Sequence, residues 1–261
     1  MDKKNAPIGV FDSGVGGISV LKTMTVLLPH EDFIYYADSA HAPYGTKTAA
    51  EVQRLSLDIT KRRLSRGAKA IVVACNTATS VSISMLRKEF STLPIIGIEP
   101  ALKPAALSLP HPRILVLATP MTIREEKFHD LFVRFDTEAE ISALPCPELV
   151  ELVEAGKLQG SEVDQVLFDK LSPFDGSVDA VVLGCTHYPF LKEAIRRVFR
   201  HEVTLYDGAL GTAKELRNRL AQRELLTNRT ANGKVVMENS LGEAEAALSE
   251  KLYSLFSPDM E

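Results

Sequence analysis

The chain of 261 residues carries 30 Lys and Arg against 34 Asp and Glu, a formal net charge of −4. Its 45% hydrophobic and 25% charged residues are typical of a globular protein and exclude a collagen-like fibre, a coiled coil or a disordered chain. Without a basic excess we expect no nucleic-acid partner, and no apolar run reaches the roughly 18–20 residues that a membrane span needs. Three cysteines favour a reducing, cytoplasmic compartment over a disulfide scaffold.

Strands and helices are predicted to alternate from the first residues onward. Ile8–Phe11 predicts a strand, which leads into the Gly-rich loop Asp12–Gly17 and a helix that ends near Leu28. Phe33–Ala37 predicts a second strand, followed by the loop Asp38–Thr46. These first elements have the order strand, loop, helix, strand that is typical of α/β proteins.

The same alternation continues through the rest of the chain. An amphipathic helix formed by Val52, Leu55 and Ile59 can end at Gly67, and the strand Ala70–Ala74 leads directly into Cys75. Further strands are predicted at Ile95–Ile98, Ile114–Ala118 and Ala180–Leu183. Further helices are predicted at Ile123–Phe135, Val163–Leu171, Phe190–Phe199, Leu210–Gln222 and Glu243–Phe256. The alternation predicts an α/β fold with mostly parallel sheet.

Two segments of the chain resemble each other. Ile71–Thr77 and Val181–His187 each consist of a buried-strand pattern, a small residue, a cysteine and two polar residues. We therefore expect two pseudo-symmetric α/β domains, each a mostly parallel sheet flanked by helices, with the active site in the cleft between them. The expected boundaries are residues 1–98 with 207–261 for the first domain and 99–206 for the second. Each of the two cysteines would follow the carboxyl end of a parallel strand, where ligands bind in open α/β sheets.

The duplicated cysteines, Cys75 and Cys185, suit acid–base chemistry at carbon. A thiol at a strand-to-helix turn has its thiolate favoured by backbone N–H groups and the helix dipole. One thiolate can remove a proton from a carbon atom while a thiol on the opposite face returns one, and the product is the mirror image. A single cysteine after a strand is usually a core residue, so Cys146, which has no counterpart, keeps that interpretation.

Polar residues surround both cysteines in the sequence. Asp12 either orients the Cys75 thiol or accepts a proton from it, or it caps the helix that follows. His187 lies two residues after Cys185 and either supports its thiol or is structural. The other neighbours offer neutral hydrogen-bond donors that suit a carboxylate-bearing ligand: Ser13, Asn76, Thr77, Thr186 and the backbone of Tyr44 and Gly45.

Four segments together resemble the glutamate racemases of the aspartate/glutamate racemase superfamily: Val10–Gly17, Pro43–Gly45, Val73–Ala78 and Leu183–Pro189. The resemblance implies cofactor-independent interconversion of L- and D-glutamate, which supplies D-glutamate for peptidoglycan, with no metal. It also implies a homodimer. Cys75 then takes the proton from D-glutamate and Cys185 takes it from L-glutamate.

The resemblance also implies roles for the neighbouring residues. Glu154 matches the acid that supports His187 and the second thiol, and Asp12 and His187 assist the two thiols. The substrate contacts implied are Asp12, Ser13, Tyr44, Gly45, Asn76, Thr77, Thr119, Thr122, Thr186 and His187. The chain departs from the family pattern at Ala118, where glycine is usual, at Pro120, and at 207–209, where Asp-Gly-Ala replaces Asp-Ser-Gly.

Alternative functions follow from the same residues. Gly14, Gly16 and Gly17 suggest a dinucleotide fingerprint, but Ser19 stands where its third glycine should be. Within the superfamily, an aspartate racemase or a one-cysteine isomerase or decarboxylase is the alternative, and a hydrolase could use one cysteine as a nucleophile beside His187. A zinc site lacks the paired Cys-x₂-Cys spacing. The duplication of the cysteine favours the racemase.

Overall fold

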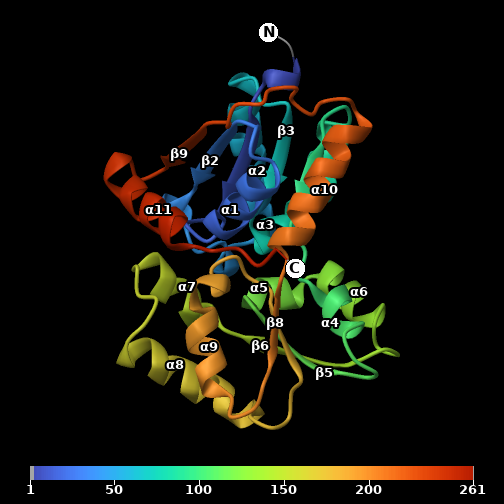
Figure 1. Cartoon of the computed structure of the whole chain (residues 1–261), viewed down its shortest axis with the longest axis vertical. Helices are drawn as coiled ribbons and strands as arrows, with labels where there is room; N and C mark the ends of the chain where they lie inside the picture. Colours follow the sequence, from blue (N-terminus) through green and yellow to red (C-terminus); the bar gives the residue numbers. More distant parts are fainter. Residues whose placement is uncertain (1–2, 261) are drawn as a thin grey trace. The chain divides into compact units, whose positions relative to one another are not determined.

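Two sheets, each built of parallel strands, organise the chain (Figure 1). The computed structural model describes residues 3–260. The backbone divides into a first unit, which runs up to Glu99 and resumes at Ala209, and a second unit, Pro100–Gly208. The predicted fold class, α/β with two parallel sheets flanked by helices, is confirmed.

The first unit contains a five-stranded sheet in the order β4-β3-β1-β2-β9. The central strands are buried on both faces, which explains why they are continuous apolar runs in the sequence. The register aligns Phe11 with Tyr36 on one side and with Val73 on the other. The strands are β1 (Ile8–Asp12), β2 (Phe33–Ala37), β3 (Ala70–Val73), β4 (Ile95–Gly97) and β9 (Val235–Asn239).

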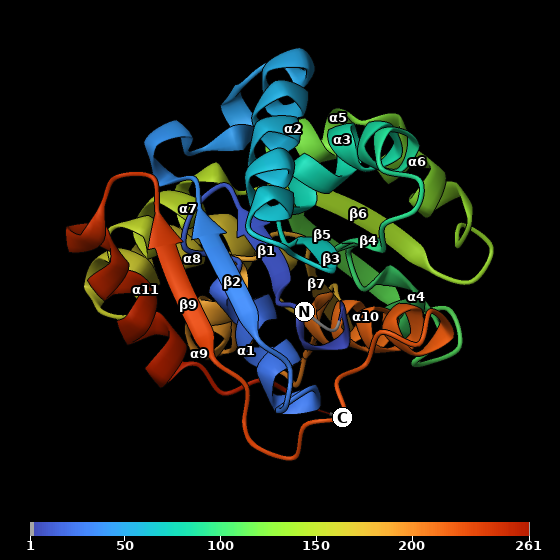
Figure 2. The ribbon, with the colours of Figure 1, turned by 90° about the horizontal axis from the view of Figure 1, so that it is seen from above.

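Helices cover both faces of this sheet. Figure 2 shows α2 and α3 on one side of the sheet and α1, α10 and α11 on the other, in agreement with the pairs of helices that pack together. The last two of these helices come from the part of the chain that follows the second unit. The helices are α1 (Ile18–Leu27), α2 (Ala49–Ser65), α3 (Asn76–Glu89), α10 (Ala209–Gln222) and α11 (Glu243–Leu255).

The second unit contains a four-stranded sheet in the order β6-β5-β7-β8. Ile114 and Val116 of β5 share one hydrophobic cluster with Val182 of β7, and α4 and α6 cover that cluster. The strands are β5 (Arg113–Ala118), β6 (Glu140–Pro145), β7 (Ala180–Leu183) and β8 (Thr204–Asp207). The helices are α4 (Leu102–Ala106), α5 (Pro120–Arg124), α6 (Glu126–Val133), α7 (Pro147–Glu154), α8 (Ser161–Leu171) and α9 (Lys192–Val198).

The two sheets repeat one topology. In each unit the first strand is central, the second lies on one side of it, and the third and fourth lie on the other side. Thus β1, β2, β3 and β4 correspond to β5, β6, β7 and β8. Because β3 and β7 are equivalent, Cys75 and Cys185 follow equivalent strands, and the predicted pseudo-symmetry is confirmed.

The boundaries of several elements differ from those that the sequence predicts. The expected helix Ile123–Phe135 is two helices, α5 and α6, because the backbone is extended at Glu125 (ψ 139°). The expected helix Phe190–Phe199 begins as a 3₁₀ turn, Tyr188–Leu191, before α9. Five elements are not predicted from the sequence: β6, β8, β9, α4 and α7. The three strands lie at sheet edges and are only partly buried, so none has the continuous apolar pattern of a central strand.

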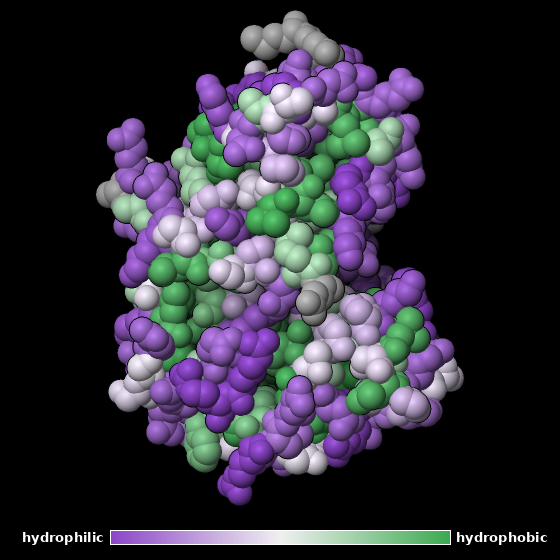
Figure 3. Space-filling view, in the orientation of Figure 1, coloured by the Kyte–Doolittle hydropathy of each residue, from purple (hydrophilic) through white to green (hydrophobic). Residues whose placement is uncertain are grey.

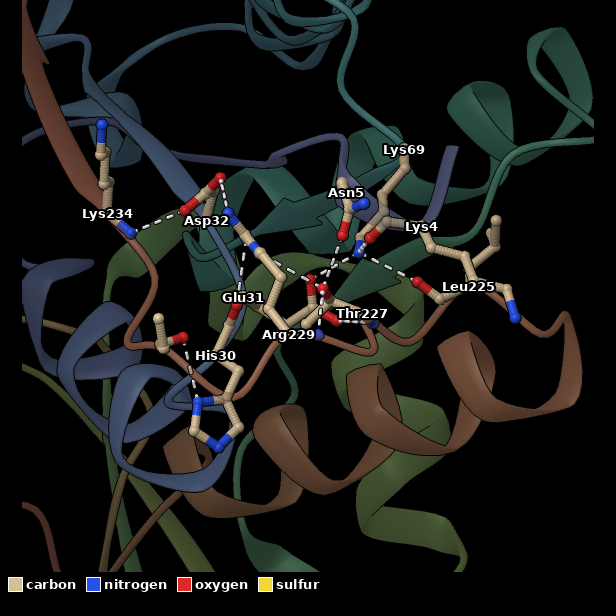
Figure 4. Close-up of polar contacts among 11 residues, drawn as sticks. Lys4, Asn5, His30, Glu31, Asp32, Lys69, Leu225, Thr227, Arg229 and Lys234 are labelled. Atoms are coloured by element: carbon tan, nitrogen blue, oxygen red, sulfur yellow. Dashed lines mark hydrogen bonds and ion pairs between the residues drawn. The ribbon is translucent and has the colours of Figure 1, made fainter. Parts of the chain in front are cut away.

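A buried ion pair and its partners join four separate segments of the chain at the amino ends of β2 and β3. Lys69 Nζ lies 2.5 Å from Glu31 Oε2 and also donates hydrogen bonds to the carbonyl oxygens of Lys4 and Leu225 (Figure 4). Glu31 Oε1 accepts a hydrogen bond from the backbone N–H of Thr227 at 2.8 Å. We refer to Lys69, Glu31 and these three partners as the Lys69 clamp. The clamp lies at the amino ends of the strands, whereas Cys75 follows the carboxyl end of β3.

The molecular surface is mixed in character. Hydrophilic residues cover much of the face in Figure 3, with hydrophobic residues interspersed among them. Within residues 3–260, no helix combines the length and apolarity needed to cross a membrane.

Candidate active site

Both cysteines of the duplicated motif lie at the topological switch point of their own sheet. In each unit the chain passes from the first strand to the second strand on one side of it. The third strand then lies on the other side of the first, so the switch point is between the first and third strands. Ligands of open α/β proteins bind at the carboxyl ends of the strands flanking this point. In the first unit these are β1 and β3, which lead to Asp12 and Cys75. In the second unit they are β5 and β7, which lead to Thr119 and Cys185.

Cys75 is the N-cap of α3. Its Sγ accepts a hydrogen bond from the backbone N–H of Ala78 at 3.4 Å and donates one to Ser13 Oγ at 3.5 Å. The side chain is buried, with 4% exposed. An N–H donor and the positive end of the helix dipole both favour negative charge on the sulfur, so this position suits a thiolate.

Asp12 organises the loop that faces Cys75. Its Oδ1 accepts hydrogen bonds from the backbone N–H of Gly14 at 2.9 Å and from Ser13 Oγ at 3.2 Å. Asp12 therefore does not cap α1, whose N-cap is Gly17 with no side-chain cap. A Cβ at Gly17 would lie 2.6 Å from the Cβ of Asp12, so glycine is required for this close approach.

Asn76 is buried beside the thiol with its side chain unsatisfied. Among the described residues, neither its Oδ1 nor its Nδ2 has a hydrogen-bond partner, although the residue is only 5% exposed. A buried carboxamide without partners is costly, and such a group in a native fold calls for an explanation. A ligand with both hydrogen-bond donors and acceptors would satisfy it.

Tyr44 and Gly45 are buried in a 3₁₀ turn, Tyr44–Thr46. The Tyr44 hydroxyl donates to Asp38 Oδ2 at 2.6 Å. Burial and this hydrogen bond raise the pKa of Tyr44 well above its usual range, and the negative charges of Cys75 and Asp12 contribute. Tyr44 is therefore uncharged, and its hydroxyl proton is held by Asp38.

In the second unit, Cys185, His187 and Glu154 form a chain of hydrogen-bonding groups. Cys185 Sγ lies 3.5 Å from His187 Nδ1, and His187 Nε2 lies 2.6 Å from Glu154 Oε1. Glu154 is the last residue of α7, which carries its carboxylate to the loop after β7. His187 and Cys185 are buried, so their contacts are shielded from water.

This arrangement stabilises positive charge on His187. Burial opposes that charge, but the hydrogen bonds to Cys185 and Glu154 outweigh it and hold the pKa of His187 well above its usual range. An imidazolium between a sulfur and a carboxylate stabilises a thiolate on the sulfur. In the second unit, the sulfur of Cys185 can therefore act as a base next to a fixed positive charge on His187.

Thr119 and Thr122 occupy the equivalent of the Asp12 loop in the second unit. Thr119 is the N-cap of α5, and its Oγ1 lies 2.9 Å from Thr122 Oγ1. Pro120 takes the first helical position, where proline needs no N–H partner, so this departure from the family pattern fits the helix start. Thr186 is buried between Cys185 and His187.

Two residues near Cys185 are structural. Cys146 is fully buried, and burial raises the pKa of its thiol to about 12, so it stays protonated at neutral pH. The Tyr188 hydroxyl donates to the Cys146 carbonyl at 2.8 Å. This bond ties the Cys185 loop to the start of α7, the helix that carries Glu154.

The structure adds residues that the sequence analysis did not assign to the site. Asp38 holds Tyr44, and Tyr35 donates to the Gly14 carbonyl at 2.7 Å. Gly184 precedes Cys185 at a position where a Cβ would lie 2.7 Å from the Leu117 carbonyl oxygen. Asp38 had a usable signal, because it follows β2 at the same sheet edge as Asp12, whereas the others depend on contacts between distant segments. Within residues 3–260, no cluster of three or more His, Cys, Asp or Glu could hold a metal ion.

The topology and the two thiol loops define a duplicated α/β protein with a buried cysteine at each switch point. The chain belongs to the Asp/Glu/hydantoin racemase family, whose model matches residues 8–216.

Named relatives agree with this assignment. A glutamate racemase of Clostridium botulinum is 46% identical over 254 residues, which cover 97% of this chain and 98% of the relative. A solved glutamate racemase of Francisella tularensis in complex with D-glutamate superposes with a TM-score of 0.83 at 30% identity, covering 99% of this chain and 98% of that one. The Escherichia coli glutamate racemase, solved with L-glutamate and the activator UDP-MurNAc-ala, has a TM-score of 0.82 at 32% identity and coverages of 95% and 94%.

Proposed function

We propose that this chain is a glutamate racemase that interconverts L- and D-glutamate by proton transfer at Cα between two thiols, without a cofactor. The D-glutamate would supply peptidoglycan synthesis. The similarity to relatives that bear this name over nearly their whole length supports the reaction and the substrate. The observation that carries the mechanism is the pair of buried cysteines at equivalent strand ends, each with its own set of polar partners.

In the direction from L- to D-glutamate, Cys185 begins as a thiolate. It forms an S–H bond with the Cα proton while the C–H bond breaks, and the electron pair stays on Cα and its carboxylate. The Cys75 thiol then delivers its proton to the opposite face of the carbanion. Cys185 ends as a thiol and Cys75 as a thiolate, so the enzyme is ready for D-glutamate and needs a proton exchange before it accepts L-glutamate again.

The two thiols have different support. The Cys185 thiolate has the His187 imidazolium beside it, held by Glu154, whereas Cys75 has the N–H of Ala78 and the Ser13 hydroxyl, which Asp12 orients. Both sets of partners favour a thiolate without a mobile counter-ion. Cys185 can thus act as the base toward L-glutamate and Cys75 as the base toward D-glutamate.

Neutral donors would hold the substrate. Asn76 has an unsatisfied carboxamide, and we assign the backbone of the buried residue Tyr44 to the substrate, since its hydroxyl proton is already donated to Asp38. We assign the hydroxyls of Thr77, Thr119, Thr122 and Thr186 and the backbone at Gly45 to the same task. Hydrogen bonds to a carboxylate are charge-assisted and therefore strong, so a dicarboxylate needs no basic cluster here.

The finer features of the proposal concern the whole protein. We propose that residues 1–98 with 207–261 and residues 99–206 act as two domains on one substrate, in a homodimer in the cytoplasm. Glutamate is preferred over aspartate on the strength of the named relatives.

The direct test is to incubate the protein with L-glutamate in D₂O without added cofactor. D-glutamate that carries deuterium at Cα is the expected product, because the donating thiol exchanges with solvent. L-aspartate tested in parallel decides between the two substrates. Unchanged L-glutamate in the presence of folded protein would refute the proposal.

Substitution of either cysteine tests the two-thiol mechanism. Cys75→Ser and Cys185→Ser should each lower kcat by at least about 100-fold, because a hydroxyl is a far weaker acid than a thiol and general acid–base catalysis supplies this much. Cys146→Ala is the matched control and should retain racemisation. Full activity in either serine variant would contradict the mechanism.

A further inference from the structure

A buried ion pair lies where the second unit's thiol loop meets the next strand. Lys192 Nζ is 2.7 Å from Asp207 Oδ2, and the two side chains are 10% and 12% exposed. Lys192 is the first residue of α9 and follows directly on the Cys185 loop and its 3₁₀ turn. Asp207 is the last residue of β8 and pairs in register with Leu183, two residues before Cys185. The pair thus joins the downstream end of the loop to the sheet.

Stability alone does not account for this pair. Removing two charges from water costs about as much as their attraction returns, and apolar residues of similar volume are often as stable. A lysine in the first turn of a helix also faces the positive end of the helix dipole. What the ion pair does provide is a fixed position for the two segments that carry Lys192 and Asp207.

The first unit has a tie at the equivalent place, made with different chemistry. Gly97 pairs with Val73 in β3 just as Asp207 pairs with Leu183 in β7. A Cβ at Gly97 would lie 2.5 Å from Cγ2 of Thr79, a residue in the first turn of the helix that follows Cys75. In both units, then, the element after the cysteine closely approaches the fourth strand at the same register position. The approach is a packing contact in the first unit and an ion pair in the second.

We infer that Lys192 and Asp207 are positioning residues, which hold the Cys185–His187 loop where its sulfur and imidazole meet their partners. The inference rests on the proposed function of that loop. Gly184 fixes the upstream end of the loop through its N–H bond to the Leu117 carbonyl at 2.7 Å. Lys192 fixes the downstream end, and Cys185, Thr186 and His187 lie between these two anchors.

The test compares Lys192→Met, Asp207→Asn and the conservative Lys192→Arg by racemase kinetics and by NMR titration of the His187 imidazole. His187 contacts the titratable groups of Cys185 and Glu154, and its raised pKa depends on contact with both. We expect Lys192→Met to lower kcat by up to about 100-fold, as a displacement of about 1 Å does. It should also lower the pKa of His187. Lys192→Arg, which keeps the positive charge, should retain most of the wild-type kcat and most of the raised pKa of His187.

The sign of the titration shift separates positioning from electrostatics. Loss of a nearby positive charge alone would raise the pKa of His187, so a rise in Lys192→Met would overturn the inference, as would an unchanged value. Asp207→Asn, which keeps the side-chain shape, decides the question by kcat if Lys192→Met does not fold. It should lower kcat, whereas the pKa of His187 does not discriminate in this variant, because loss of a negative charge alone would also lower it. In Asp207→Asn, an unchanged kcat contradicts the inference.

The matched control is another ion pair of the same helix. Arg197 Nη2 lies 2.6 Å from Asp164 Oδ1, but both side chains are about half exposed. Arg197→Met should leave kcat and the His187 titration unchanged, because exposed pairs contribute little. The titration needs no racemase activity, so a wild-type protein without racemisation would refute the proposed function and still leave the positioning inference to be decided by NMR.

Discussion

The residues of the candidate site differ in how much of their role can be predicted from the sequence. The duplication of a strand followed by a cysteine identifies Cys75 and Cys185, because a repeated motif is visible without any contact information. Lys192 and Asp207 have no such signal. They are 15 positions apart in the sequence, and only the register of β7 with β8 brings them together.

Asn76 provides a prediction at the scale of a single side chain. Its carboxamide is buried without a partner, so Asn76→Leu should stabilise the substrate-free protein by about 1–3 kcal/mol. The same change should raise KM for glutamate, since the donor and acceptor are lost. Urea unfolding without ligand and steady-state kinetics measure the two effects. A variant that is less stable and binds glutamate normally would show that the carboxamide has a structural role.

At the scale of elements, the buried parts were the predictable ones. Strands β1, β3, β5 and β7 are apolar on both faces and were predicted within one residue at each end. The edge strand β9 was not predicted, because its residues are mostly half-exposed. Helix α7 begins at a Pro-Glu pair and lasts only eight residues, which is too short for a clear periodicity. Its last residue, Glu154, was nevertheless assigned through the resemblance.

Glycines at element boundaries allow a paired stability test. Gly184→Ala would place a Cβ 2.7 Å from the Leu117 carbonyl oxygen, a backbone atom that cannot move independently. We expect a loss of about 1–3 kcal/mol, as for other overpacked sites. The control is Gly211 in α10, where an added Cβ meets nothing within 4 Å.

Gly211→Ala should instead stabilise the protein by about 0.5–1 kcal/mol, because alanine is the better helix former. Urea unfolding of both variants measures the contrast. Equal effects of the two substitutions would mean that the loop before Cys185 relaxes freely, and the close approach at Gly184 would then be unimportant.

At the scale of the molecule, the first unit depends on contacts between remote parts of the sequence, and the Lys69 clamp is its clearest example. Glu31→Gln removes the carboxylate from a buried ammonium and should destabilise the protein by about 3–5 kcal/mol. The folded protein should keep its normal kcat, since the clamp lies at the amino ends of the strands and Cys75 follows a carboxyl end. Urea unfolding together with activity under native conditions tests both statements.

Two variants complete this test. Glu215→Gln removes an exposed pair with Arg219 and should cost no more than about 0.5 kcal/mol. The double variant Lys69→Met with Glu31→Leu replaces both charges by apolar side chains and should recover most of the lost stability. If Glu31→Gln costs as little as Glu215→Gln, then the clamp contributes nothing beyond an ordinary surface pair.

The first unit is interrupted by the second, and this has a consequence for biosynthesis. Strand β9 and helix α10 belong to the first unit but leave the ribosome only after the whole of Pro100–Gly208. At about 5–20 residues per second, that delay is roughly 5–20 s. Until then β2 has an open edge and α1 lacks the helix that packs on it. The contiguous second unit can fold first, while the nascent first unit is the part that a chaperone would have to protect.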